Sequence, residues 1–252
     1  MPEHPVLAGA EPFSAPGGPH GALVLHGFTG SPQSMRGLAE ALAAAGFAVE
    51  LPRLPGHGTA LEDMLETQWD DWAATAERAY EELAARCDKV VVAGLSMGGT
   101  LTLWLAERHR EIAGIVLVNP AVDPPAESFR EMLQGILDSG NPVMPAVGND
   151  IAEPGRTELA YDGTPVAPLL SMLDAGAEIA AALDTIECPV LLMNSPQDHV
   201  VPPASSDMVA ERVAGPVERV TLERSYHVAT LDYDRDEIER RAVAFAEKVA
   251  AG

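Results

Sequence analysis

Residues 90–99 read Val90-Val91-Val92-Ala93-Gly94-Leu95-Ser96-Met97-Gly98-Gly99, and this stretch decides the fold. Its first five residues carry no polar side chain, which is typical of a strand buried on both faces of a sheet. A G-x-S-x-G pattern overlaps the end of this run, and helical spacing then continues to Arg108. A serine placed between a buried strand and a helix sits on a tight turn that exposes its hydroxyl. We therefore predict a strand–turn–helix unit with Ser96 as a nucleophile.

Apolar runs of strand length lie on both sides of this unit and alternate with helical spacing. We predict strands at residues 21–25, 47–51, 115–119, 190–194 and 217–222, and helices at 35–42, 69–83, 97–108 and about 236–249. Such alternation predicts an α/β fold with a parallel sheet covered by helices. Ligands of these sheets bind beyond the carboxyl ends of the strands, so polar residues that follow strands are the candidates for a site.

Residues 120–184 interrupt the alternation and contain no strand-like run. At about 60 residues, the segment is too long for a plain crossover connection. It holds two helical stripes of apolar side chains: Phe129, Met132, Leu133, Ile136 and Leu137, then Leu169, Leu170, Met172 and Leu173. We predict one domain, residues 1–252, with a cap inserted at about 120–184. The alternative is that this segment is a long crossover connection between two strands, without a function of its own.

The charge excludes several classes of partner. The chain has 16 Lys and Arg against 38 Asp and Glu, a net charge of −22, and its only lysines are Lys89 and Lys248. Nucleic-acid binding needs cationic side chains, and an anionic membrane surface repels such a protein. The balance favours a neutral or cationic small-molecule substrate. We see no apolar run long enough to span a membrane and no signal peptide, and we expect a cytoplasmic protein with two free thiols, Cys87 and Cys188.

A serine hydroxyl needs a base, and this turn geometry predicts the chain order Ser, Asp or Glu, His. His227 follows the last predicted strand and fits the base. Asp198 follows the strand at 190–194 and fits the carboxylate that orients the imidazole, with Asp123 as a rival acid. The histidine beside this acid, His199, is not expected to be the base.

Two backbone N–H groups should stabilise the oxyanion. Met97, the residue after the nucleophile, supplies one, and Phe28 in the loop after the first predicted strand supplies the other. His26 and His57, both next to glycines, are interpreted as organising turns rather than as catalysts. We find no spacing for a metal site and no cofactor fingerprint, and we interpret Asp232, Asp234 and Asp236 as solvated surface.

Taken together, the motifs resemble those of bacterial monoacylglycerol lipases of the Bacillus type and of related carboxylesterases. The resemblance covers residue 21 to the end of the chain and rests on five motifs, at residues 26–30, 51–58, 94–99, 197–202 and 225–232. It implies an α/β-hydrolase fold: a mostly parallel eight-stranded sheet with a small cap inserted after the sixth strand. It also implies Ser96, Asp198 and His227 as the triad, Phe28 and Met97 as oxyanion donors, and hydrolysis of monoacylglycerols to glycerol and fatty acid.

For the substrate we expect the cap to line the acyl path, through Phe129, Met132, Leu133, Ile136 and Leu169. Ordinary packing between cap and core is the alternative for the first stripe. Glu158 is expected to accept a hydrogen bond from a glycerol hydroxyl. The substrate class allows transient contact with lipid aggregates.

Two other functions remain open on the sequence. The first is a broad short- to medium-chain carboxylesterase without selectivity for glycerol, because selection by acyl length is shallow at about 0.8 kcal/mol per methylene. The second is a non-catalytic binding protein on the same scaffold, which the presence of Ser96, Asp198 and His227 disfavours.

Overall fold

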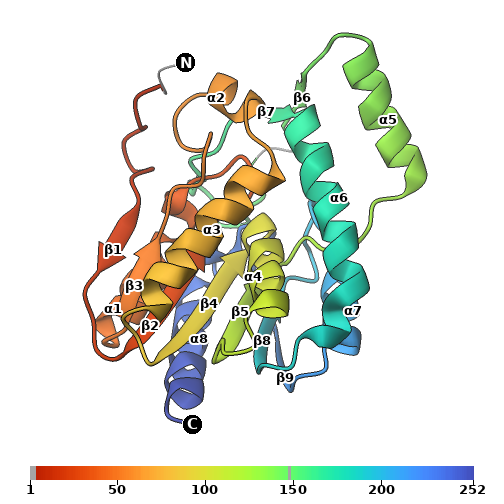
Figure 1. Cartoon of the computed structure of the whole chain (residues 1–252). Helices are drawn as coiled ribbons and strands as arrows, with labels where there is room; N and C mark the ends of the chain where they lie inside the picture. Colours follow the sequence, from red (N-terminus) through yellow and green to blue (C-terminus); the bar gives the residue numbers. More distant parts are fainter. Residues whose placement is uncertain (1–3, 147–148) are drawn as a thin grey trace.

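The computed structural model describes residues 4–146 and 149–252, and a seven-stranded sheet runs through its centre (Figure 1). The strand order is β1-β3-β2-β4-β5-β8-β9, and each neighbouring pair is parallel except β1 with β3. These strands are β1 (Phe13–Ala15), β2 (His20–Leu25), β3 (Ala48–Leu51), β4 (Lys89–Leu95), β5 (Gly114–Val118), β8 (Val190–Asn194) and β9 (Val217–Thr221). The predicted α/β class and parallel sheet are confirmed.

Helices cover both faces of the sheet, because the central strands are apolar on both sides. In β4, Val90 and Val92 join one buried cluster, whereas Val91, Ala93 and Leu95 join the other, as a period of two residues requires. The second cluster includes side chains of α1 (Arg36–Ala44) and α8 (Arg235–Ala250). The first is covered by α3 (Trp69–Ala84), α4 (Met97–Arg108), α6 (Val166–Ala182) and α7 (Pro203–Arg212) (Figure 1).

The turn between β4 and α4 depends on two glycines. A Cβ on Gly94 would lie 2.0 Å from the Gly98 carbonyl oxygen, and a Cβ on Gly98 would lie 2.1 Å from the Leu25 carbonyl oxygen. Both contacts are with backbone atoms, which cannot move aside as a flexible side chain can. The start of α4 is therefore packed directly against the carboxyl end of β2, and only glycine permits this approach.

The segment between β5 and β8 has its own small structure. It contains α5 (Glu127–Asp138) and a two-stranded antiparallel pair, β6 (Val143–Pro145) and β7 (Gly163–Pro165), which leads into α6. α5 packs against α6 and stands at one end of the molecule (Figure 1). The expectation that this segment holds no strand is wrong, because strands of three residues that contain proline give no apolar run. Residues 147 and 148 of the predicted cap lie outside the described residues.

Two details of the predicted sheet are also wrong. Within the described part of the chain the main sheet has seven strands rather than eight, and the inserted segment follows the fifth strand rather than the sixth. Residues 4–12, which precede β1, form no strand. Pro5 and Pro12 lie in this stretch, and proline has no N–H to donate to a strand ladder.

One region is long and apolar enough to span a membrane by length and composition alone. It is residues 166–185, with a mean hydropathy of 1.5, although Ser171, Asp174 and Glu178 interrupt its apolar side chains. In the structure its helix, α6, contacts α3, α4 and α5, and 44% of its most apolar window is buried within the protein. This is how a helix of a folded domain packs.

Replacing Gly98 by alanine should strongly destabilise the fold, because the new methyl group meets the backbone of β2. We expect the free energy of unfolding to fall by about 3 kcal/mol or more, measured by urea denaturation. Gly135→Ala is the matched control: it lies within α5, where an added Cβ would meet nothing within 4 Å. There, alanine should be neutral or stabilise by up to about 1 kcal/mol. Equal effects of the two substitutions would contradict the packing argument.

Candidate active site

A cavity of about 680 Å³ lies beside the carboxyl ends of the strands and beneath the inserted segment. Ser96 and His227 both line it. So do four of the other residues predicted for the site: Phe28, Phe129, Glu158 and Leu169. The structure thus brings together side chains that lie far apart in the sequence, at the edge of the sheet where the parallel topology predicts a ligand site.

Ser96 sits on a strained turn. Its backbone has φ 55° and ψ −118°, a conformation that non-glycine residues rarely adopt. The Ser96 N–H donates to the Val118 carbonyl oxygen at 3.0 Å, and the Ser96 carbonyl oxygen accepts from the Thr100 N–H at 3.1 Å. These bonds to β5 and α4 hold the strained conformation in place. Ser96, 9% exposed, thus lines the cavity at the turn that the G-x-S-x-G pattern predicts.

His227 is 6% exposed, and its ring nitrogen Nδ1 lies 2.7 Å from Asp198 Oδ2. The other carboxylate oxygen, Oδ1, accepts the N–H groups of Val200 and Val201, each at 2.8 Å. Asp198 is therefore fixed by its own loop while it holds one nitrogen of the imidazole. The rival acid, Asp123, also lines the cavity, where its N–H donates to Ser205 Oγ at 3.2 Å.

The backbone of His227 is held from two directions. Its carbonyl oxygen accepts a hydrogen bond from Asn119 Nδ2 at 2.8 Å, and its N–H donates to Asp150 Oδ2 at 3.0 Å. Asn119 directly follows β5, has φ 44° and also accepts the Ser195 N–H at 2.8 Å. It thereby ties the end of β5 to the loop that follows β8 and to His227.

The loop after β2 lies against Ser96. A Cβ on Gly27 would lie 3.5 Å from the Ser96 Cβ, so the backbone of this loop passes next to the serine. Met97 is the first residue of α4, and its N–H has no partner within the helix. His26 stabilises the loop: its Nε2 accepts the Leu54 N–H at 3.1 Å, and its Nδ1 lies 3.0 Å from the Gly27 carbonyl oxygen.

An aromatic cluster stands behind this loop. The His57 ring packs edge-on against those of His26 and Trp72, and Trp72 also contacts Phe28, with centroid separations of 5.0, 5.4 and 5.7 Å. Burial lowers the pKa of His26 to about 4 and holds the pKa of His57 well below its usual range. Both rings are neutral and fully buried, which agrees with the predicted structural role.

Glu158 lies at the opposite side of the same loop. A Cβ on Gly30 would be 2.6 Å from Glu158 Oε1, so this carboxyl group packs onto the turn that carries Phe28. Burial raises the pKa of Glu158, although the charge of His227 and a hydrogen bond from Ser34 act in the opposite direction. A carboxyl group in this position can exchange hydrogen bonds with a polar part of a ligand beside His227.

The first apolar stripe of the inserted segment contributes fewer residues to the cavity than predicted. Phe129 and Leu169 line the cavity, but Met132, Leu133 and Ile136 are not among its lining residues. Met132 is 45% exposed, and Leu133 is fully buried. Only the amino-terminal end of α5 faces the cavity, because the rest of the helix packs along α6. The alternative of ordinary packing therefore holds for this stripe beyond Phe129.

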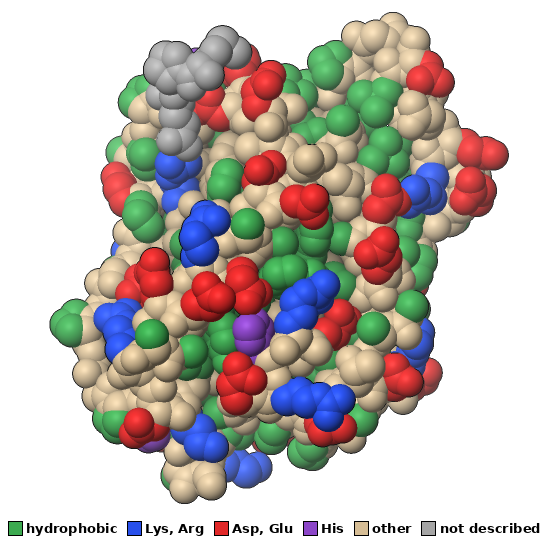
Figure 2. Space-filling model, in the orientation of Figure 1, with side chains coloured by type: hydrophobic (Ala, Val, Ile, Leu, Met, Phe, Trp, Pro, Cys, Tyr) green, Lys and Arg blue, Asp and Glu red, His purple; other side chains and the backbone are tan. Residues whose placement is uncertain are grey.

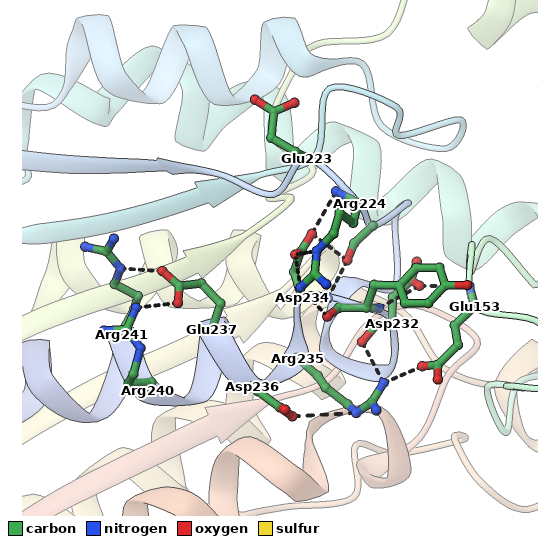
Figure 3. A network of polar contacts seen from close by, with 12 residues as sticks. Glu153, Glu223, Arg224, Asp232, Asp234, Arg235, Asp236, Glu237, Arg240 and Arg241 are labelled. Atoms are coloured by element: carbon green, nitrogen blue, oxygen red, sulfur yellow. Dashed lines mark hydrogen bonds and ion pairs between the residues drawn. The ribbon is translucent and has the colours of Figure 1, made fainter.

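Two of the aspartates interpreted as solvated surface are buried. Asp232 is 0% exposed and its carboxylate accepts four backbone N–H groups, from Ala152, Glu153, Tyr226 and Tyr233. Asp234 is 6% exposed and accepts from the side chain of Arg224 and the hydroxyl of Ser225 (Figure 3). The interpretation failed because charge alone indicates solvent, whereas several N–H donors can satisfy a buried carboxylate. Asp236 is exposed as expected.

Four carboxyl groups contribute to the polar lining of the cavity. Asp123, Asp150, Glu158 and Asp162 line it, and no lysine or arginine does so among residues 4–146 and 149–252. On the face of the molecule shown in Figure 2, acidic and basic side chains are interspersed. In the same described part of the chain, no group of three His, Cys, Asp or Glu side chains is arranged to hold a metal ion.

Sequence reasoning missed two residues that contact His227. Asn119, a polar residue at the end of the predicted strand at 115–119, could have been found from that position. Asp150 gave none, because its segment has no regular pattern. The exposed His199, expected not to be the base, has its Nδ1 2.8 Å from Asp150 Oδ1.

Comparisons with known proteins agree with this geometry. Residues 19–234 match the family model Hydrolase_4, described as serine aminopeptidase, S33. The chain is 49% identical over 98% of both chains to the thermostable monoacylglycerol lipase of Bacillus sp. (strain H-257). It is 28% identical to the carboxylesterase of Bacillus subtilis (strain 168), over 95% of this chain and 97% of the relative.

Among solved structures, one reported for LipS and LipT, two metagenome-derived lipolytic enzymes, superimposes with a TM-score of 0.91. The identity is 41%, over 97% of this chain and all of the other. Together with the sequence relatives, this match confirms both the resemblance found from the motifs and the α/β-hydrolase fold.

The buried histidines should make stability fall on acidification. Between pH 6.5 and about 4, unfolded His26 binds a proton that the folded state does not, so the free energy of unfolding decreases as pH falls. Between pH 7 and pH 5 we expect His26 to account for a decrease of about 2 kcal/mol in the free energy of unfolding. Urea denaturation at both pH values should show a smaller decrease in His26→Gln than in the unsubstituted protein. Equal decreases would contradict the assignment of a neutral, buried His26.

Proposed function

The chain belongs to the Hydrolase_4 family, and from this membership and the geometry of the cavity we propose that it is a serine ester hydrolase that cleaves monoacylglycerols to glycerol and free fatty acid. The observation that carries the proposal is the 49% identity to a monoacylglycerol lipase over nearly the whole chain. The contact between His227 and Asp198 beside a cavity that holds Ser96 supports the reaction type.

In the proposed reaction His227 takes the proton of Ser96, whose oxygen attacks the ester carbonyl carbon. The oxyanion is stabilised by the N–H groups of Phe28 and Met97, and loss of one such donor typically costs about 10²–10³ in rate. His227 then protonates the leaving glycerol, and water hydrolyses the acyl-enzyme by the same steps. Asp198 holds the imidazole in the tautomer that can accept the serine proton.

The inserted segment, residues 120–184, acts as a cap in this proposal. Apolar side chains on its cavity side, among them Phe129, Leu169 and Met172, form the path for the acyl chain, while Glu158 binds a glycerol hydroxyl. Phe129, Met132 and Val200 are exposed apolar residues on α5 and beside the cavity, which supports transient contact with lipid aggregates. The two unpaired cysteines support a cytoplasmic location.

A broad carboxylesterase is the second candidate, favoured by the 28% identity to the Bacillus subtilis enzyme. The two functions differ in whether the alcohol part of the ester is recognised. An esterase of this kind depends on the acyl chain alone, whereas a monoacylglycerol lipase also gains binding energy from glycerol in the transition state.

Head-group selectivity distinguishes the two candidates when the acyl chain is held constant. We expect kcat/KM for 1-lauroylglycerol to exceed that for methyl laurate and for trilaurin by more than about tenfold, or about 1.4 kcal/mol. Equal values for 1-lauroylglycerol and methyl laurate would leave a general carboxylesterase. Ser96→Ala is the blank, and activity that survives in it would overturn the mechanism.

Glu158→Ala tests the recognition of glycerol. The substitution removes a hydrogen-bonding partner of the head group, so the preference for 1-lauroylglycerol over methyl laurate should fall about tenfold. Activity on methyl laurate should stay within about threefold, since this ester has no hydroxyl to bind. Glu131→Ala, on the exposed face of α5, is the matched control and should change neither rate. A parallel loss on both substrates would show that Glu158 supports the site rather than glycerol binding.

A further inference from the structure

We propose that Asp150 is a positioning residue that holds the backbone of His227, and with it the imidazole, in the geometry required for catalysis. Asp150 belongs to the inserted segment and not to the sheet or its loops. The inference rests on the proposed function only in taking His227 as the base. It is independent of which ester is the substrate.

Asp150 contacts two loops, the one that carries Asp198 and the one that carries His227. Its Oδ2 accepts the N–H of His227 at 3.0 Å and that of His199, next to Asp198, at 3.1 Å. Its Oδ1 lies 2.8 Å from His199 Nδ1, and its carbonyl oxygen accepts the Val228 N–H at 3.1 Å. The Asp150 side chain is 12% exposed, so these bonds are largely protected from water.

Asp150 is itself held firmly. The N–H groups of Ala152 and Glu153, shortly after it in the chain, donate to the buried carboxylate of Asp232 at 2.7 and 2.9 Å. The Glu153 carboxylate in turn pairs with Arg235 at the start of α8 (Figure 3). Hydrogen bonds between residues 150–153 and residues 226–235 therefore run both ways. Asp150 accepts from His227, and Asp232 accepts from Ala152 and Glu153.

His227 needs such restraints because it lies outside regular structure. Residues 222–228 form no helix or strand, so no ladder of backbone hydrogen bonds fixes them. Three contacts stand in for a ladder: Asn119 on the carbonyl group, Asp198 on the ring and Asp150 on the N–H. Only the last comes from the inserted segment. Loss of Asp150 would leave the His227 N–H without its acceptor, and this end of the residue would be held only through Tyr226, whose N–H donates to Asp232 and whose carbonyl oxygen accepts from Ser195. Displacement of a catalytic group by about 1 Å can cost about 10²-fold in rate.

The test measures hydrolysis of p-nitrophenyl butyrate and the rate at which a fluorophosphonate labels Ser96. Neither probe contains glycerol, so the outcome is separate from head-group selectivity. For Asp150→Ala we expect kcat and the labelling rate to fall about 10–100-fold, with KM within about threefold of the unsubstituted enzyme. Asp150→Asn keeps one carbonyl oxygen for the His227 N–H and should restore kcat to within about threefold of the unsubstituted enzyme.

Two further variants separate positioning from general effects on the fold. Asp138→Ala removes an exposed carboxylate from α5 and should leave both rates unchanged. Asp150→Glu keeps the charge but displaces the carboxylate by about 1.5 Å. If Asp150 acts by position, kcat should fall in this variant. If it acts only through its charge, kcat should be unchanged. This variant replaces Asp150→Ala if the latter does not fold. Proton NMR should show the low-field signal of the His227–Asp198 hydrogen bond shifted or lost together with kcat.

Unchanged kcat in both Asp150→Ala and Asp150→Glu would overturn the proposal, as would a rise confined to KM, which indicates a substrate contact. A loss of kcat in Asp150→Asn equal to that in Asp150→Ala would also overturn the proposal, because kcat would then depend on the charge of Asp150 rather than on its hydrogen-bond acceptor. If the unsubstituted protein neither hydrolyses the ester nor reacts with the fluorophosphonate, the proposed function fails instead. The two failures are therefore distinguishable.

Discussion

The site depends on one steric constraint: the backbone of α4 at Gly98 packs directly against the backbone of β2 at Leu25. Because β2 and β4 are neighbours in the sheet, the chain must reverse sharply after β4 to bring α4 this near. The reversal places Ser96 in a positive-φ conformation and directs the first N–H groups of α4 toward the loop after β2. One steric condition thus accounts for the strained conformation of Ser96 and for the packing of α4 against β2.

Backbone strain is concentrated at the same edge of the sheet. Thr29, Ser96 and Asn119 are the non-glycine residues with positive φ in the part of the chain that the structure describes. They follow β2, β4 and β5, three adjacent strands, and each lies within or beside the cavity. Such conformations persist only where surrounding contacts hold them. The buried bonds of Asn119 and the packing around Ser96 provide those contacts, so the scaffold supports strain where the chemistry is proposed to occur.

The central strands, the contact of Asp198 with His227, and the shared cavity of His227 and Ser96 could be predicted, for one physical reason. A strand buried on both faces carries an unbroken apolar run, and the polar residues that follow such runs in a parallel sheet meet at one edge. β1, β6 and β7 escaped prediction because three residues form no pattern, and α7 because its Ser and Asp residues mask the helical period. Asp150 could not be predicted, since its partners lie 49 and 77 residues away and are mostly backbone atoms. Asp232 and Asp234 were misinterpreted because their donors are mostly N–H groups, which every sequence contains.

The carboxyl-lined cavity has a further consequence when substrate and product are compared. An ester of glycerol is neutral, whereas the fatty acid released from it is an anion at neutral pH. The field of Asp123 and Asp162 has little effect on the first and repels the second. No cationic side chain among the lining residues of the described chain can retain the product. Turnover itself therefore creates a repulsion that the substrate does not experience, and the departure of the acid is favoured by a charge that exists only after the reaction.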